Sequence, residues 1–145
     1  MTSSASPCTC GRLRRAARAL TQLYDDAMAP SGLRVTQFSL LRTLARIGSS
    51  RISDLADAML LERSALSRNL DPLVDRKLVA VSPGADARTR EVRLTPAGKR
   101  ALAAAAPHWQ RAQAHVAKRV GADKIDALVQ TLAELEALHP AAAGA

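Results

Sequence analysis

The chain has 145 residues and a formal net charge of +8, from 21 Lys or Arg and 13 Asp or Glu. This length fits one domain with its own core, and the basic balance favours an anionic partner, with nucleic acid as the first candidate. No apolar run approaches the ~18 residues of a membrane span. The first ten residues lack the apolar core of a signal peptide, so a cytoplasmic protein without membrane contact is expected.

Aromatic side chains are scarce, because the chain has one Phe, one Tyr and one Trp. Proteins that bind single strands stack successive bases on several aromatic faces, so this composition argues against them and against RNA-reading sheets. The sequence also has no glycine-rich phosphate loop, no cluster of metal ligands at the usual spacings and no nucleophile elbow. It therefore predicts neither an enzyme nor a protein with a resident cofactor or metal.

Residues 1–10 are small and polar and are expected to form a disordered tail. From residue 11 to about residue 29, apolar side chains recur at helical spacing, and Pro30 then ends the helix. A second helix is expected over 36–47, with the hydroxyl of Thr36 as its cap.

Residues 51–76 have the pattern of two helices joined by a tight turn. Ser53 caps the first helix, and the second runs from Glu62 to about Arg76, with leucines at spacings of three and four facing inward. Short polar groups and guanidiniums precede any large apolar block in the second helix, as in a helix whose N-terminal half meets base edges and phosphates. By itself this pattern is equally typical of an ordinary solvated helix face. The candidate DNA contacts are Arg63, Ser64, Ser67, Arg68 and Asn69.

Pro72 interrupts this second helix. It removes the hydrogen bond to the Arg68 carbonyl, at a cost of roughly 3 kcal/mol in a helix interior. A kink is expected rather than an early end, because Leu70, Val74 and Leu78 keep the inward spacing across the proline.

A β-hairpin is expected to follow, with strands over 79–82 and 90–94. Its tip carries Asp86, Arg88 and Arg90 and supplies a second basic element. A lone basic loop is usually a mobile, solubilising one, but an arginine at a hairpin tip can enter the minor groove, where negative potential is concentrated.

The last third of the chain predicts two helices. Thr95 and Pro96 form a strong helix start, and a long helix follows to about residue 120. Asp123 is expected to cap the final helix, and residues 140–145 to form a tail. The final helix carries an apolar repeat, which is expected to pack against another helix. That repeat includes Ile125, Leu128, Leu132 and Leu135.

Two further pairs of residues stand out. Cys8 and Cys10 lie two residues apart, too close for an unstrained disulfide with each other, but they could cross-link subunits or ligate a soft metal. The alternative is two incidental cysteines in a frayed tail. Tyr24 and Trp109 could line a ligand pocket between the end helices and the central lobe, or simply pack in the core or in an interface.

The order of two helices, helix-turn-helix, β-hairpin and two long helices resembles the MarR family of bacterial transcriptional regulators. The matching stretches are residues 35–48, 52–79 and 86–98. The last stretch is the most specific, because the family's wing reads Asp-x-Arg, a few residues, then Leu-Thr-x-x-Gly. The residues that match this motif are Asp86, Arg88, Leu94, Thr95 and Gly98.

The resemblance implies a mostly α (α+β) fold. A winged helix-turn-helix lobe would span about 36–95, with dimerisation helices at about 11–29 and 96–139, and the family domain would cover 11–139. Members of the family are obligate dimers that bind palindromic operators, usually as repressors, and release them when a small ligand or an oxidant acts. The implied dimer contacts are Leu13 and Leu20 together with the apolar repeat of the last helix.

By position, the resemblance would place Ser64, Ser67, Arg68 and Asn69 in the major groove. Arg88 would enter the minor groove, with Asp86 orienting its guanidinium. Two residues depart from the family pattern: Pro72 lies inside the recognition helix, and Lys77 stands where a glycine is frequent. Both put the angle of the recognition helix in the DNA groove in doubt.

The leading hypothesis is thus a homodimeric regulator of double-stranded DNA, a repressor of a palindromic operator that a small-molecule ligand releases. The first alternative is a thiol- or metal-responsive regulator that senses through Cys8 and Cys10. From another class, the chain could be a sequence-neutral architectural DNA-binding protein.

Overall fold

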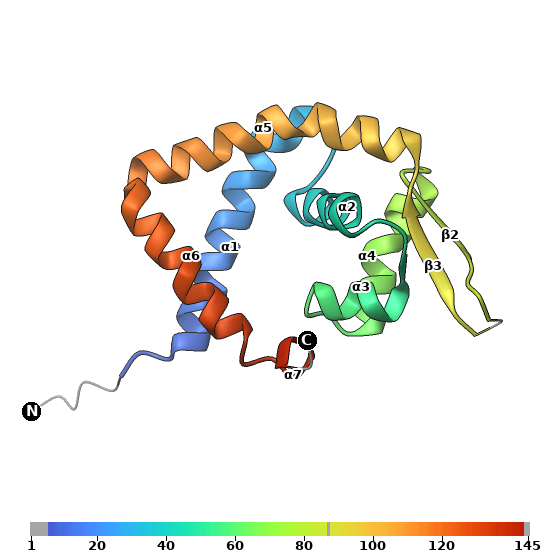
Figure 1. Cartoon of the computed structure of the whole chain (residues 1–145). Coiled ribbons are helices and arrows are strands. Elements are labelled where there is room, and N and C mark those ends of the chain that lie inside the picture. The colour runs from blue at the N-terminus through green and yellow to red at the C-terminus, as the bar shows by residue number, and fades with distance from the viewer. Residues whose placement is uncertain (1–5, 87, 144–145) are drawn as a thin grey trace, which may run out of the picture.

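Helices at the two ends of the chain form one side of the molecule, and a lobe of short helices and strands forms the other (Figure 1). The structure is a computed structural model that describes residues 6–86 and 88–143. Its elements are α1 (Thr9–Met28), the short 3-10 helix η1 (Ala29–Ser31), α2 (Val35–Ile47), β1 (Ser50–Arg51), α3 (Ile52–Ala58), α4 (Arg63–Asp75), β2 (Val79–Pro83), β3 (Arg90–Leu94), α5 (Pro96–Val120), α6 (Ala122–Glu136) and α7 (Pro140–Ala143).

The strands form a three-stranded antiparallel sheet in the order β1-β3-β2. The hairpin of β2 and β3 pairs Val79 with Leu94 and Val81 with Val92. Val92 is fully buried and Val79 nearly so, which fixes which face of the hairpin turns to the core. The predicted mostly helical fold with a winged helix-turn-helix lobe is confirmed.

The hydrophobic core lies in this lobe and where the lobe meets α5. α2, α3 and α4 contribute its largest side chains, and Met28 and Ala105 extend it to α1 and α5. By contrast, none of the residues of α6 is buried. None of the helices in the described part of the chain is both long enough and apolar enough to cross a bilayer.

The start of α5 is attached to the end of the recognition helix. As predicted, Thr95 caps α5: its Oγ1 accepts a hydrogen bond from the Gly98 amide at 3.0 Å. The same hydroxyl donates to the carbonyl of Lys77 at 2.7 Å. A Cβ at position 98 would lie 2.0 Å from the Leu78 carbonyl oxygen, so only glycine allows this approach.

Several expected element boundaries are wrong by one or two residues. α1 begins at Thr9, and Cys8 is its cap. Helix α2 is capped by Arg34 rather than Thr36, because the Gln37 side chain accepts from the Arg34 amide and takes over the capping.

The other differences concern helix starts and the C-terminus. α3 begins at Ile52, one residue before the expected cap Ser53. Gly121 precedes α6, and Asp123 lies in the first turn of that helix instead of capping it. Residues 140–143 form the short helix α7, where a tail was expected.

Helix α4 runs without interruption across Pro72, so an early end is excluded. It ends in a Schellman motif, in which the Leu78 amide donates to the Leu73 carbonyl and the Lys77 amide to the Val74 carbonyl, both at 2.9 Å. The motif requires a left-handed residue, and Lys77 takes that position with φ of 60°. This is the position where a glycine was expected.

Helix α3 ends in the same way, with Leu60 at φ of 53° in the turn of the helix-turn-helix. The Leu61 amide donates to Ala56 at 2.9 Å and the Leu60 amide to Asp57 at 3.1 Å. A residue with a Cβ costs roughly 1 kcal/mol or more in this conformation. The two helix ends that set the orientation of α4 are therefore both strained.

We predict that Lys77→Gly raises the free energy of unfolding by roughly 0.5–1 kcal/mol, because glycine removes the left-handed penalty but adds chain entropy to the unfolded state. Lys77→Ala is the matched control and should leave stability nearly unchanged, since alanine keeps the Cβ. Urea unfolding of the three proteins measures the effect. A glycine variant no more stable than the alanine variant would contradict a strain at this position.

Candidate nucleic-acid interface

The N-terminal half of α4 presents its polar residues together on one side. The side chains of Leu66, Leu70 and Leu73 are at most 2% exposed and hold the opposite side of the helix in the core. The five candidate contacts predicted from the sequence are all exposed: Arg63, Ser64, Ser67, Arg68 and Asn69. The structure thus places the predicted reading residues on the solvent side of the recognition helix.

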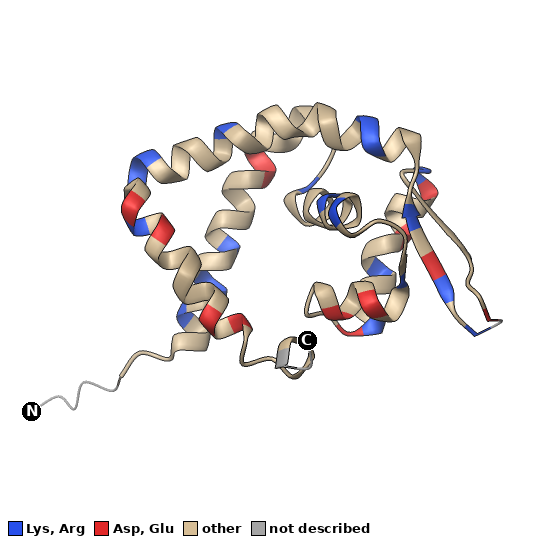
Figure 2. Ribbon diagram, in the orientation of Figure 1, with Lys and Arg blue, Asp and Glu red and all other residues tan. Residues whose placement is uncertain are grey.

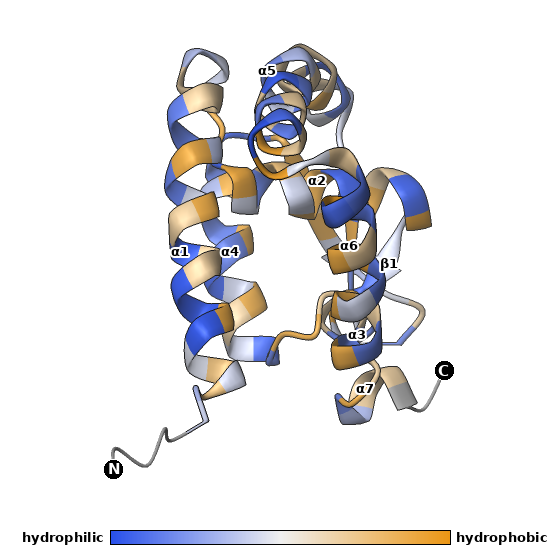
Figure 3. Cartoon of the chain, turned by 90° about the vertical axis from the view of Figure 1, so that its left-hand side faces the viewer, coloured by the Kyte–Doolittle hydropathy of each residue, from blue (hydrophilic) through white to orange (hydrophobic). Residues whose placement is uncertain are grey.

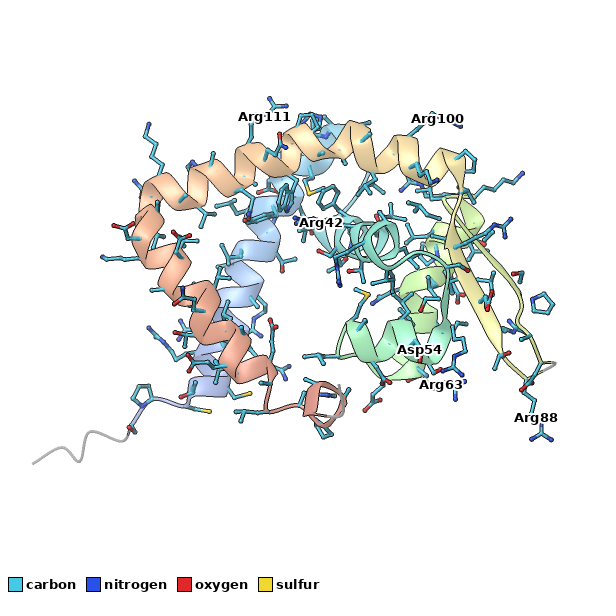
Figure 4. All side chains as sticks on the ribbon, viewed as in Figure 1. Arg42, Asp54, Arg63, Arg88, Arg100 and Arg111 are labelled. Carbon is cyan, nitrogen blue, oxygen red and sulfur yellow. The ribbon has the colours of Figure 1, made fainter. Side chains whose placement is uncertain are left out.

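The tip of the wing is held by local hydrogen bonds. The Asp86 carboxylate accepts from the Arg88 amide at 2.7 Å, and the Thr89 hydroxyl donates to the Asp86 carbonyl at 3.0 Å. The Gly84 amide closes the hairpin by donating to the Thr89 carbonyl at 2.7 Å. The guanidinium of Arg88 extends from this tip into solvent (Figure 4).

The Asp86 carboxylate contacts the backbone of the wing tip. Its carboxylate binds the backbone amide of Arg88, and within the described ranges it makes no ion pair with the Arg88 guanidinium. Asp86 therefore shapes the turn from which Arg88 projects, and its orientation of the Arg88 guanidinium on DNA stays a prediction.

A narrow cleft separates the recognition helix from the wing. It has a volume of about 180 Å³ and is lined by β1, the start of α3, the start of α4 and the tip of the wing. Arg63 and Arg88 extend to the same end of the molecule on its two sides (Figure 4). The lining residues are Arg51, Ile52, Ser53, Arg63, Arg88, Thr89 and Arg90.

Arg51 lines this cleft and was not among the residues predicted from the sequence. Its Nε donates to Asp54 Oδ2 at 2.9 Å and its Nη2 to Asp54 Oδ1 at 3.2 Å, a bidentate pair. The hydrogen bond with Asp54 raises the pKa of Arg51 further above its ordinary value. The only sequence signal was an arginine three residues before an aspartate at the start of a helix.

A second groove flanks α4 on its other side. It has a volume of about 360 Å³ and lies between α4 and the start of α2. Pro72 lines this groove and Arg63 lines the cleft; they are nine residues apart, about two and a half turns, and so lie on opposite flanks of the helix. The lining residues are Arg34, Thr36, Gln37, Arg68, Asn69 and Pro72.

Basic residues thus lie on both flanks of the exposed, polar face of α4. Figure 2 shows basic segments on the wing and along α4, with acidic segments interspersed on α3 and β3. Guanidiniums on both sides of an exposed helix suit the two phosphate backbones that border a major groove.

The structure does not bring the two aromatic candidates together in one cavity. Tyr24 lines a cavity of about 270 Å³ with Ala17, Leu20, Thr21 and Val35. Its hydroxyl donates to Gln113 of α5, and partial burial raises the pKa of Tyr24. Trp109 instead stacks on Phe38, with ring centroids 5.5 Å apart, and Arg42 lies 4.3 Å from the centre of its ring.

The cysteines lie at the start of α1, on the opposite side of the molecule from the wing (Figure 1). Both are exposed, and Cys8 Sγ accepts from the Gly11 amide at 3.4 Å. In residues 6–86 and 88–143, no three His, Cys, Asp or Glu side chains are grouped closely enough to hold a metal ion.

Helix-turn-helix, wing and basic flanks together define a winged helix-turn-helix DNA-binding protein. Comparison with known proteins identifies the family. Residues 31–89 match the sequence model of the MarR family. A search of curated protein sequences gives no match.

Solved structures give a broader match. The transcriptional regulator MosR of M. tuberculosis, in complex with DNA, is 41% identical, with a TM-score of 0.76 over 89% of this chain and 98% of that one. The transcriptional repressor CouR, bound to a 23-mer DNA duplex, is 26% identical, with a TM-score of 0.80 over 88% of this chain and 92% of that one. The regulator BpsR of Bordetella bronchiseptica is 25% identical, with a TM-score of 0.76 over 86% of this chain and 96% of that one. The chain belongs to the MarR family of DNA-binding transcriptional regulators.

The wing contact gives a prediction about Asp86. Asp86→Asn keeps a side-chain oxygen that accepts from the Arg88 amide, so DNA binding should be retained or become tighter. Asp86→Ala removes the acceptor, and binding should weaken by a few fold, roughly 1 kcal/mol. Fluorescence anisotropy with a labelled duplex measures both. Equal weakening in the two variants would show that Asp86 acts through the guanidinium of Arg88.

Proposed function

We propose that this chain acts as a homodimeric repressor that binds a palindromic duplex and is released by a small-molecule ligand. The observation that carries the DNA-binding part is the convergence of the exposed N-terminal half of α4 and the wing tip on one end of the lobe. One helix and one wing read too few base pairs for a specific site, whereas two copies related by a two-fold axis read a palindrome.

The case for a dimer comes from α1 and α6. Apolar side chains on both helices are exposed in a single chain: Leu13 is 39%, Leu20 40% and Leu128 42% exposed. Hydrophobic segments recur along α1 (Figure 3). Because an amphipathic helix gains its stability mainly by burying its apolar face, α6 requires a partner. A second copy of α1 and α6 supplies one, and Ile125, Leu132 and Leu135 would complete that interface.

The case for a ligand comes from a cavity and a relative. The cavity lined by Tyr24 lies where α1 meets the start of α2, so a molecule bound there would contact both α1 and the DNA-binding lobe. In the relative BpsR, 6-hydroxynicotinic acid regulates DNA binding. A ligand that binds more tightly to one arrangement of the two subunits' recognition helices and wings shifts the protein toward that arrangement.

The reading residues can be tested with Arg68→Ala and Arg88→Ala. Each should weaken binding to a duplex selected from a random pool by roughly tenfold or more, with the dimer intact by analytical ultracentrifugation. The wild type should bind its selected duplex near ~10⁻⁸–10⁻¹⁰ M and at least ~10³-fold more tightly than random duplex. Arg100→Ala, on α5 away from Arg63 and Arg88 (Figure 4), controls for the lost charge.

Unchanged affinity in both variants would overturn the assignment of Arg68 and Arg88. A wild type without preference for any duplex would favour a sequence-neutral architectural protein instead.

A specific observation also supports thiol sensing as a second candidate function. Cys8 caps α1 through its sulfur, and Cys10 follows in the first turn, so both exposed thiols sit at the end of a proposed dimerisation helix. Oxidation or metal binding there would change the start of α1 and, through it, the dimer.

This candidate predicts that hydrogen peroxide releases the wild type from its selected duplex and that dithiothreitol restores binding. The Cys8→Ser/Cys10→Ser variant should stay bound, while the serine at position 8 keeps an N-cap acceptor for the Gly11 amide. Oxidised wild type that remains on the duplex would eliminate thiol sensing and leave the small-molecule route.

A further inference from the structure

The cleft between α4 and the wing has the size and chemistry of a site for a small anion. At about 180 Å³ it is smaller than the cavities that usually hold drug-sized ligands, roughly 300–1,000 Å³. Four arginines and two hydroxyl residues line it, and no carboxylate does. Guanidiniums and hydroxyls are the groups that bind phosphate oxygens.

Arg51 is oriented within this cleft by neighbours on two sides. Asp54 holds it through two hydrogen bonds, which use two of the five N–H donors of a guanidinium. Its backbone is paired with Glu91 in β3, next to Arg90, so it moves with the wing. The Arg51 and Asp54 side chains are 56% and 52% exposed. An exposed pair of this kind contributes little to stability, and its effect is on the position of the guanidinium.

In a complex with DNA, the geometry of the duplex determines what occupies this cleft. When a recognition helix occupies the major groove and a wing occupies the adjacent minor groove, one sugar-phosphate backbone separates the two grooves. That backbone must pass between α4 and the wing. The cleft lined by Arg51 is the space between those two elements.

We propose that this cleft is a backbone-phosphate site and that Arg51, positioned by Asp54, donates to the phosphate that passes between the recognition helix and the wing. The proposal rests on the proposed DNA-binding mode and adds a contact outside both the recognition helix and the wing tip. Such a contact fixes the register of the protein on the duplex and carries no sequence information.

Arg51→Ala should therefore weaken binding to the selected duplex and to random duplex equally, by roughly tenfold. Each lost phosphate contact lowers the slope of log K against log salt by about 0.9, so a dimer should lose about 1.8. The ratio of the two affinities should stay unchanged, unlike in Arg68→Ala. Arg100→Ala again serves as the charge-matched control and should change neither quantity.

Asp54→Ala gives the sharper test, because electrostatics and positioning predict opposite results. Removing an acidic group near DNA should tighten binding if only charge matters. If Asp54 positions Arg51, binding should weaken by several fold. Asp57→Ala removes an exposed carboxylate from the same helix without disturbing Arg51 and should bind as tightly as the wild type or more tightly.

The outcomes separate this proposal from the proposed function. If the wild type selects a duplex but Arg51→Ala keeps its affinity and salt slope, or Asp54→Ala binds more tightly, the phosphate site is wrong and the regulator remains. If no duplex is preferred, the specific regulator fails. In that case, the slope of log K against log salt on random duplex, compared between the wild type and Arg51→Ala, still tests whether Arg51 contacts a phosphate. Urea unfolding of every variant separates loss of contact from loss of fold.

Discussion

Burial of one leucine face of α4 determines most of what the lobe can do. Leu66 and Leu73 are fully buried, and Leu70 is 2% exposed, so the helix cannot rotate about its axis without exposing them. A rotation would cost roughly 1.5–3 kcal/mol for each leucine returned to water. The opposite face is thereby held toward solvent as well. Hydrophobic packing on one side thus orients the polar residues on the other.

The sequence predicted this arrangement well because it depends on period and on local caps. Leucine spacing located α4, and the Thr95 hydroxyl before Pro96 located the start of α5. The residues it missed depend on tertiary neighbours. Arg51 and Arg34 precede helices in the sequence and look like ordinary polar linkers. They become part of the candidate interface only because β1 pairs with the wing and the start of α2 packs beside α4.

Conformation at two positions was equally hard to predict. Leu60 and Lys77 both occupy left-handed backbone, where glycine would be the expected residue. No pattern in the sequence indicates this at Leu60, and at Lys77 only the resemblance to the family pattern did. The surrounding hydrogen bonds and the buried leucines impose both conformations. At Pro72, too, tertiary packing overrides the local preference of the residue. The helix continues across it because the burial of Leu70 and Leu73 on either side outweighs one lost hydrogen bond.

The junction at Thr95 and Gly98 makes α5 a lever arm. Its 25 residues extend about 37 Å, and one end is fastened to the end of the recognition helix by the Thr95 hydroxyl. A tilt of about 5° around the far end would move the near end by about 3 Å, close to the ~3.4 Å separation of successive base pairs. A tilt of a few degrees about the far end of α5 can therefore move the recognition helix by about one base-pair step along a duplex.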